Sequence, residues 1–203
     1  MRDFTHINSY LDKLYGDIYQ QPEDSGHTRY AQKVIDHWCS RMTTCKSVLD
    51  VGCGEGFCQP MFERWNVKYE GVAIGEDVIN AQAKGRNVKR MDFSFLEHPD
   101  NSFDLIFSRH SLEHSPMPVI TLLEWARVST NWLGIVLPAP EWYTYTGLNH
   151  YSVMNMEQVK NLLNVAGWKV MWEDIHFELF DKEKPESRTP NEYWLMCEKK
   201  RGI

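Results

Sequence analysis

The sequence has no run of apolar residues long enough to cross a bilayer, which needs roughly 18. Segment 1–19 mixes Arg2, Asp3, Asp12 and Lys13 with apolar side chains, which is unlike a secretory signal peptide. Basic residues are also scarce, because 22 Lys and Arg stand against 28 Asp and Glu and give a formal net charge of −6. This balance disfavours a nucleic-acid partner. We therefore expect a cytoplasmic protein without membrane attachment, and the sequence leaves its oligomeric state open.

A cysteine framework is missing as well. The chain has five cysteines, an odd number, and none of them forms a C-x-x-C pair. Reduced thiols fit this pattern better than disulfides or a structural zinc site. The H-E-x-x-H motif of zinc hydrolases is also absent.

What the sequence does contain is a strand followed by three alternating glycines. Val48-Leu49-Asp50-Val51 is a short apolar run, typical of a parallel strand buried on both faces. Gly52, Gly54 and Gly56 follow, and glycine permits the positive φ and close backbone approach that a ligand-binding turn needs. The next helix would add N–H groups that have no partner within the helix. We interpret segment 48–56 as a cradle for a small molecule.

Two phosphate-binding patterns are absent from this turn. A P-loop ends in Gly-Lys-Ser or Gly-Lys-Thr, whereas this turn continues Gly56-Phe57-Cys58. The dinucleotide fingerprint G-x-G-x-x-G needs a glycine where Phe57 stands. The carboxylates of Asp50 and Glu55 flank the turn, so a cationic ligand fits it better than a pyrophosphate.

Apolar periodicity predicts alternating helices and strands along the rest of the chain. Helical faces are expected in segments 7–18, 30–42 and 156–166, the last closed by Gly167 at a C-cap position. Strand-like runs occupy 46–51, 68–73, 87–91, 103–108, 133–137, 168–180 and 191–198, and the polar segment 181–190 is interpreted as a hairpin tip. We predict an α/β fold with a doubly wound, mostly parallel seven-stranded sheet and an antiparallel C-terminal hairpin.

The turn at 48–56 resembles motif I of the class I S-adenosylmethionine-dependent methyltransferases. Further segments resemble that family in the same order. Met91-Asp92-Phe93 resembles its adenine-binding segment and 101–108 its fourth strand, and segments 112–114 and 124–128 resemble the short and the long helix that follow in its small-molecule branch. Four segments in order are more specific than one glycine loop. The resemblance covers roughly residues 46–140 and implies S-adenosylmethionine as cofactor, S-adenosylhomocysteine as product and a Rossmann-like fold.

The resemblance also implies cofactor-binding residues. In the glycine turn these are Asp50, Gly52, Cys53, Gly54 and Gly56. Later in the chain Asp92 is expected to accept a hydrogen bond from the adenine amine, a role compatible with a helix N-cap. Phe93 either packs on the adenine ring or belongs to the core. Ser108 closes the predicted fourth strand. Tyr15 lies in a segment that resembles the cap over the methionine part of the cofactor, or else packs the leading helix.

One family position departs from the pattern. The family has Asp or Glu at the end of the second strand, where it binds the ribose hydroxyls, and this chain has Ala73. Glu76 is predicted to replace that acid, with Asp77 as the other candidate. Alternatively, both carboxylates only stabilise a helix N-terminus.

Methyl transfer from a sulfonium needs mainly positioning, and a base only if the acceptor must lose a proton. His110 follows the fourth strand at the sheet edge where open α/β sheets bind ligands, and His150 lies in an aromatic linker. Both are predicted to be catalytic. Alternatively, His110 is a half-buried structural residue that bonds a loop carbonyl. The alternative for the linker that contains His150 is to cover the sheet edge without contacting a substrate. Glu113 and His114 belong to the family's scaffold segment, so no metal site is predicted from the spacing of His110 and His114.

The predicted organisation is one domain over 1–203. It comprises an N-terminal helical cap (1–45), a cofactor-binding core (46–140) and a substrate-side linker, helix and hairpin (141–203). The predicted function is methyl transfer from S-adenosylmethionine to a small-molecule or glycan-like acceptor, with oxygen favoured over nitrogen. Ala73 motivates one alternative, a non-catalytic cofactor-binding or partner-binding domain of the same fold. The glycine spacing disfavours another, a nucleotide-linked oxidoreductase.

Overall fold

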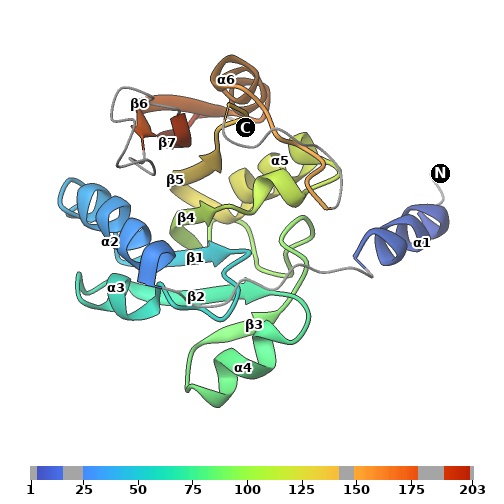
Figure 1. The fold of residues 1–203 in the computed structure, drawn as a ribbon, viewed down its shortest axis with the longest axis horizontal. Helices are drawn as coiled ribbons and strands as arrows, with labels where there is room; N and C mark the ends of the chain where they lie inside the picture. Colours follow the sequence, from blue (N-terminus) through green and yellow to red (C-terminus); the bar gives the residue numbers. More distant parts are fainter. Residues whose placement is uncertain (1–3, 16–24, 142–148, 178–189, 202–203) are drawn as a thin grey trace, which may run out of the picture.

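The computed structural model describes residues 4–15, 25–141, 149–177 and 190–201. Its centre is a seven-stranded sheet in the order β3-β2-β1-β4-β5-β7-β6 (Figure 1). The strands are β1 (Ser47–Val51), β2 (Lys68–Ala73), β3 (Val88–Arg90), β4 (Phe103–Arg109), β5 (Ser129–Pro138), β6 (Trp168–Phe177) and β7 (Pro190–Lys199). The helices are α1 (Thr5–Leu14), α2 (Ser25–Cys39), α3 (Gln59–Glu63), α4 (Asp77–Ala83), η1 (Leu112–His114), α5 (Pro118–Val128) and α6 (Met156–Val165).

The pairing of the strands confirms the predicted fold class. β3, β2, β1, β4 and β5 are parallel neighbours, whereas β7 runs antiparallel to both β5 and β6. The carboxyl ends of the parallel strands therefore meet at one edge of the sheet, where open α/β folds bind their ligands. Because β7 is antiparallel, its beginning lies at that same edge, with Glu192 opposite Pro138.

Most strand boundaries agree with the sequence expectations, and β5 differs most. It begins at Ser129 instead of Leu133, because Ser129 already pairs with Phe103 of β4. The predicted strand 168–180 is observed to Phe177, and positions 178–180 lie outside the described residues, as do the expected hairpin tip over 181–189 and position 18 of the first helix.

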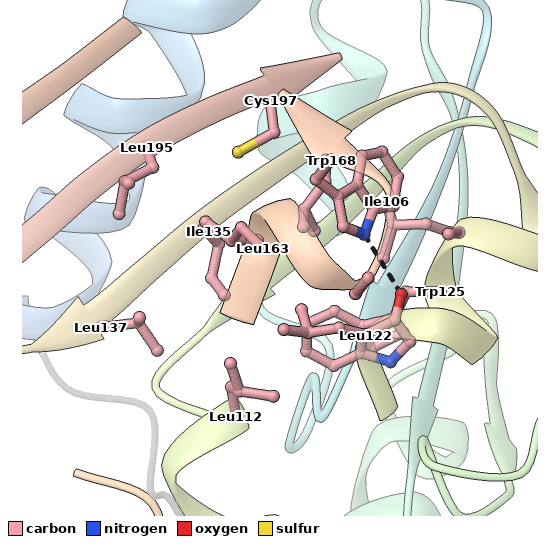
Figure 2. Packing of buried hydrophobic residues seen from close by; sticks show 14 of the residues in the cluster. Ile106, Leu112, Leu122, Trp125, Ile135, Leu137, Leu163, Trp168, Leu195 and Cys197 are labelled. Atoms are coloured by element: carbon pink, nitrogen blue, oxygen red, sulfur yellow. Dashed lines mark hydrogen bonds between the residues drawn. The ribbon is translucent and has the colours of Figure 1, made fainter. Parts of the chain in front are cut away.

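Helices cover both faces of the sheet and enclose two apolar clusters. α5 and α6 cover one face, where Trp125 and Trp168 are completely or almost completely buried and the Trp168 indole donates to the Leu122 carbonyl at 3.1 Å (Figure 2). α2 and α3 cover the other face, where Trp38 lies against the glycine of β5: a Cβ added to Gly134 would be 2.5 Å from the Trp38 ring. The sheet is thus buried on both faces, as near-continuous apolar strands require.

The first helix stands apart from the sheet in Figure 1. Of the predicted apolar face of α1, Leu11 is buried, whereas Ile7 and Tyr10 remain 36% and 63% exposed. Its carboxyl end reaches the linker before α6, because the Tyr151 hydroxyl donates to the Leu14 carbonyl at 3.5 Å. Within the described residues, every helix is too short or too polar to cross a membrane.

Candidate functional site

The glycine turn at the end of β1 forms a cradle made of backbone. Gly52, Gly54 and Gly56 have φ angles of +71°, +54° and +70°, the left-handed region that other residues enter at a cost. The Gly52 amide donates to the Val72 carbonyl of β2 at 2.9 Å, which fixes the turn against the sheet. A Cβ on Gly52 would lie 2.5 Å from the Ser111 hydroxyl oxygen. The space a side chain would need at Gly52 is therefore already taken, so the backbone itself lines the cradle.

The two carboxylates that flank the turn face different surroundings. Asp50 is buried and accepts a hydrogen bond from the Tyr69 hydroxyl at 2.8 Å. Burial raises the pKa of Asp50 to about 7, opposed by the Tyr69 hydrogen bond and the nearby Arg109. Glu55 instead turns toward α4, where it accepts hydrogen bonds from Lys84 and Asn80. Only Asp50 of this pair lies beneath the turn.

Cys53 contributes its backbone to the cradle, because its thiol points into the sheet. The sulfur packs against Gly71, where an added Cβ would be 2.6 Å from it. Burial and the neighbouring Asp50 raise the pKa of Cys53 well above its usual value. A buried thiol of this kind is poorly reactive toward alkylating agents.

The structure separates the two candidate ribose-binding acids. Ala73 ends β2, and Asp77 opens α4 with 6% of its surface exposed, whereas Glu76 is exposed. The Asp77 charge contributes to the raised pKa of the Cys53 thiol, so the two side chains lie near each other.

The predicted adenine segment and Tyr15 come together from distant parts of the chain. The Asp92 carboxylate accepts from the Ser94 amide at 2.8 Å. The Phe93 ring meets Trp125 edge-on, with centroids 6.1 Å apart, and remains half-buried. Burial and the charge of Asp92 raise the pKa of Tyr15, whose buried hydroxyl lies near Asp92 and Ser94 but forms no hydrogen bond of regular geometry within the described part of the chain.

A carboxylate that the sequence analysis did not identify organises the end of β4. Glu192 of β7 accepts from Arg109 at 2.7 Å and pairs with the His110 Nε2 at 2.8 Å, both through Oε1, while its Oε2 accepts from the Trp194 indole at 2.8 Å. Burial opposes the charge of Glu192, but the His110 hydrogen bond and Arg109 prevail and hold its pKa well below the usual range. Next to this cluster, the Ser108 hydroxyl is buried without a hydrogen-bond partner among the described residues.

This arrangement changes the interpretation of His110. Its φ of +51° is strained for a non-glycine residue, and its amide donates to the Val136 carbonyl at 3.0 Å. The Nε2 atom is engaged with Glu192, and Nδ1 lies 3.8 Å from the Glu113 carboxylate. The partner is a carboxylate on β7 and not the loop carbonyl considered from the sequence. The hydrogen bond to Glu192 fixes the orientation of the His110 ring.

His150 lies against the segment that was predicted to be scaffold. One ligand atom each of Glu113, His114 and His150 lie within 4.8 Å of one another. The His114 and His150 rings are 4.7 Å apart, and the His114 Nδ1 bonds the Asn149 carbonyl at 2.8 Å. Burial raises the pKa of Glu113 to about 8 and lowers that of His114 to about 4. The sequence suggested these residues one by one, without their juxtaposition. The other aromatic residues of the linker, at positions 142–145, lie outside the described residues.

Known proteins resemble this chain in sequence over part of its length. A family model described as "Methyltransferase domain" matches residues 49–131. A methyltransferase of Mycobacterium sp. (strain KMS) is 33% identical over 138 residues, covering 60% of this chain and 52% of the relative. Phosphoethanolamine N-methyltransferase of Plasmodium falciparum is 24% identical over 197 residues, covering 83% of this chain and 71% of that protein. The chain thus spans about half the length of the mycobacterial relative.

Solved structures share the fold at low identity. A SAM-dependent methyltransferase from Archaeoglobus fulgidus has a TM-score of 0.68 and 18% identity, covering 96% of this chain and all of that one. The [4+2]-cyclase SpnF has a TM-score of 0.69 and 16% identity, covering 98% of this chain and 95% of the cyclase. Because a cyclase shares the fold, the fold alone does not identify a reaction.

The glycine cradle and the buried hydroxyls of Tyr15 and Ser108 suit a ligand with several polar groups. The matched family model covers the cradle and the end of β4. Residues 49–131 thus match a methyltransferase domain, and the sheet order and TM-scores show that the chain shares the fold of solved S-adenosylmethionine-dependent methyltransferases.

Proposed function

We propose that this protein transfers the methyl group of S-adenosylmethionine to a small-molecule acceptor at the carboxyl edge of the sheet. The observation that carries the proposal is the backbone cradle of Gly52, Gly54 and Gly56, which lies beside Asp50 and in front of α4. The bound sulfonium supplies an activated methyl group. What remains for the protein is to hold donor and acceptor in line.

The chain offers groups to hold the cofactor at both of its ends. The glycine cradle and the Asp50 carboxylate would face the positively charged methionine part. Asp92 and the half-buried Phe93 would face the adenine, and Asp77 would reach the ribose in place of the missing acid at Ala73. The Tyr15 hydroxyl, which lies near Asp92, would close over the cofactor from the end of α1.

The acceptor side is lined by groups from β4, β7 and the linker before α6. His110 is held by Glu192, so we assign it a positioning role rather than that of a base. His150 lies at the half-exposed edge of this region, where an acceptor would enter, and burial lowers its pKa so that its neutral form predominates at pH 7. We infer an acceptor with a hydroxyl group. The Plasmodium relative and ajmaline N-methyltransferase from Rauvolfia serpentina are both named as N-methyltransferases. Amines are therefore the acceptor class to test beside hydroxyl compounds.

Calorimetry on the purified chain tests the cofactor. S-adenosylmethionine and S-adenosylhomocysteine should both bind at micromolar concentrations, and NAD should not bind. A Gly54→Val variant serves as the control, because a branched side chain at φ +54° obstructs the cradle. Absence of binding by the wild-type chain would overturn the proposal. An acceptor screen with hydroxyl and amine compounds then tests transfer, with product detected as S-adenosylhomocysteine.

A second candidate is a protein that binds the cofactor without transferring its methyl group. Ala73 favours it, because the usual ribose-binding acid is missing, and the cyclase SpnF shares the fold. Tight cofactor binding combined with no turnover on any acceptor in the screen would favour this candidate.

A further inference from the structure

We propose that Glu113, His114 and His150 form a binding site for one divalent transition-metal ion of the zinc class, on the acceptor side of the sheet. The three residues come from two places in the chain. Glu113 and His114 belong to η1 after β4, and His150 belongs to the linker before α6. No metal site was predicted from the sequence, because the spacing there drew attention to His110 and His114, and His110 is instead bound to Glu192.

The geometry of the three ligand atoms is close to what a metal requires. They lie within 4.8 Å of one another, whereas ligands of a tetrahedral zinc ion are about 3.4 Å apart when each bond is about 2.1 Å. Binding of an ion would therefore draw the three ligand atoms closer together by up to about 1.4 Å. His114 and His150 are only half-buried, so an ion can enter from the solvent side.

The orientation of His114 follows the usual arrangement of a metal-bound imidazole. Its Nδ1 lies 2.8 Å from the Asn149 carbonyl, which can only accept, so Nδ1 carries the proton and the lone pair is on Nε2. A ligating histidine normally donates its other N–H to a carbonyl or carboxylate in this way. Asn149 adopts a left-handed φ of +74°, and the amides of Tyr151 and Ser152 donate to the Glu113 carbonyl at 2.7 and 2.9 Å. These contacts hold the linker against η1.

Glu113 gives an independent reason to expect a cation. Its side chain is almost completely buried, with the residue 1% exposed, and its Oε2 accepts no hydrogen bond from any described residue. A buried carboxylate oxygen without a partner is rare unless a ligand or ion completes it. The charge of Arg109 acts on Glu113, but the Arg109 guanidinium is paired with Glu192 at 2.7 Å.

The ligand types select the class of ion. Two imidazoles and one carboxylate suit zinc and neighbouring transition metals, whereas calcium and magnesium prefer oxygen ligands throughout. Three protein ligands leave at least one coordination position open. If the proposed methyl transfer holds, on which this role rests, an acceptor hydroxyl at that position would lose its proton more readily.

Cobalt titration tests the site on the full chain, freed of any affinity tag and stripped with a chelator. Co²⁺ is the probe because its visible absorption reports coordination by protein ligands. We expect one Co²⁺ per chain, displaced by Zn²⁺. His150→Ala and Glu113→Gln should each weaken binding at least about 100-fold, because even loss of an outer partner costs 10–100-fold. The matched control is His98→Gln, since His98 forms a pair with Glu70 at 2.7 Å that has no third ligand in the described chain.

Either absence of stoichiometric Co²⁺ binding or equal binding by His150→Ala would overturn the proposal. Thermal melts verify that each variant folds, and His150→Gln replaces His150→Ala if the latter does not. Calorimetry with S-adenosylhomocysteine on the metal-free protein separates the two proposals. Cofactor binding without Co²⁺ binding would overturn the metal site alone, whereas Co²⁺ binding without cofactor binding would overturn the proposed function alone.

Discussion

The cofactor side and the acceptor side of this sheet edge are formed by different kinds of chemical group. Around β1 and β2 the site consists of backbone: three glycines with left-handed φ, and amides that bond the Val72 carbonyl. Around β4, β5 and β7 it consists of ionisable side chains that meet across long stretches of sequence, such as Glu192 and His110. Arg109 connects the two sides. It pairs with Glu192, and its charge partly opposes the rise that burial causes in the pKa of Asp50.

Substitutions on the two sides should therefore act by different physical mechanisms. A cradle made of backbone has no room for added atoms, so even a small side chain there should obstruct ligand binding sterically. In a network of buried charges, removal of one partner leaves the other charge unpaired, which lowers the free energy of unfolding even where the backbone keeps its conformation. We therefore expect changes to the glycine cradle to weaken cofactor binding strongly, and changes on the acceptor side to reduce stability and turnover with little effect on cofactor binding.

The largest effect is expected from Gly52→Ala. The new Cβ would lie 2.5 Å from the Ser111 hydroxyl oxygen at a φ of +71°, so the turn must move. We expect at least about a 100-fold loss of S-adenosylhomocysteine affinity, roughly 2.7 kcal/mol, and a loss of about 4 kcal/mol in stability. Calorimetry and urea unfolding measure the two.

Gly85→Ala is the matched control for that variant. Gly85 has nearly the same φ, +72°, but a Cβ there would meet nothing within 4 Å. It should lose about 1 kcal/mol from backbone strain and keep its cofactor affinity. If both variants bind the cofactor equally well, close approach at Gly52 does not matter and the cradle interpretation is wrong.

On the acceptor side, Glu192→Gln should cost about 3 kcal/mol in the free energy of unfolding. The substitution leaves Arg109 and His110 without their shared carboxylate in a buried position. Cofactor affinity should fall far less than in Gly52→Ala, because the cradle is untouched. Glu198→Gln is the control on the same strand, and since Glu198 is exposed it should change stability by less than about 0.5 kcal/mol. Equal effects of the two variants would contradict the network.

Asp50 is an ionisable side chain on the cofactor side, beneath the backbone cradle, so stability there should depend on pH. Its pKa is about 7 in the folded protein and about 4 in the unfolded chain, so the folded state binds the proton more tightly. Stability from this group is complete below about pH 4 and is lost as the pH rises through 7. Between pH 5 and 7 the loss should be on the order of 2 kcal/mol.

Asp50→Asn removes this titration while its side-chain oxygen can still accept from Tyr69. Urea midpoints at pH 5 and pH 7 should therefore differ less in the variant than in the wild-type chain. Asp12→Asn, a change at an exposed position of α1, should leave the wild-type dependence intact. An identical pH dependence in Asp50→Asn would show that other groups cause it.

The same contrast explains what the sequence could predict. The glycine turn and the positions of most strands follow from local patterns, because glycine spacing and apolar runs are readable within a few residues. The partner of His110 was not predictable, since nothing local connects position 110 with Glu192 in the last strand. Glu192 and Glu198 flank the same apolar run 193–197, so the sequence does not show which of them is buried. Burial likewise distinguishes Glu76 from Asp77, and their adjacency in the sequence hides that difference.

The smallest expected effect comes from Tyr15→Phe, which tests whether the cofactor side includes α1. The Tyr15 hydroxyl is buried and forms no hydrogen bond within the described residues, so its removal should leave stability unchanged or slightly higher. If the hydroxyl serves the cofactor, S-adenosylhomocysteine affinity should fall about fivefold, close to 1 kcal/mol. Tyr10→Phe is the control, because Tyr10 is 63% exposed on the same helix and should change neither quantity. A Tyr15→Phe variant that is less stable but binds the cofactor normally would assign Tyr15 to packing, and the cofactor side would then consist of the sheet edge without α1.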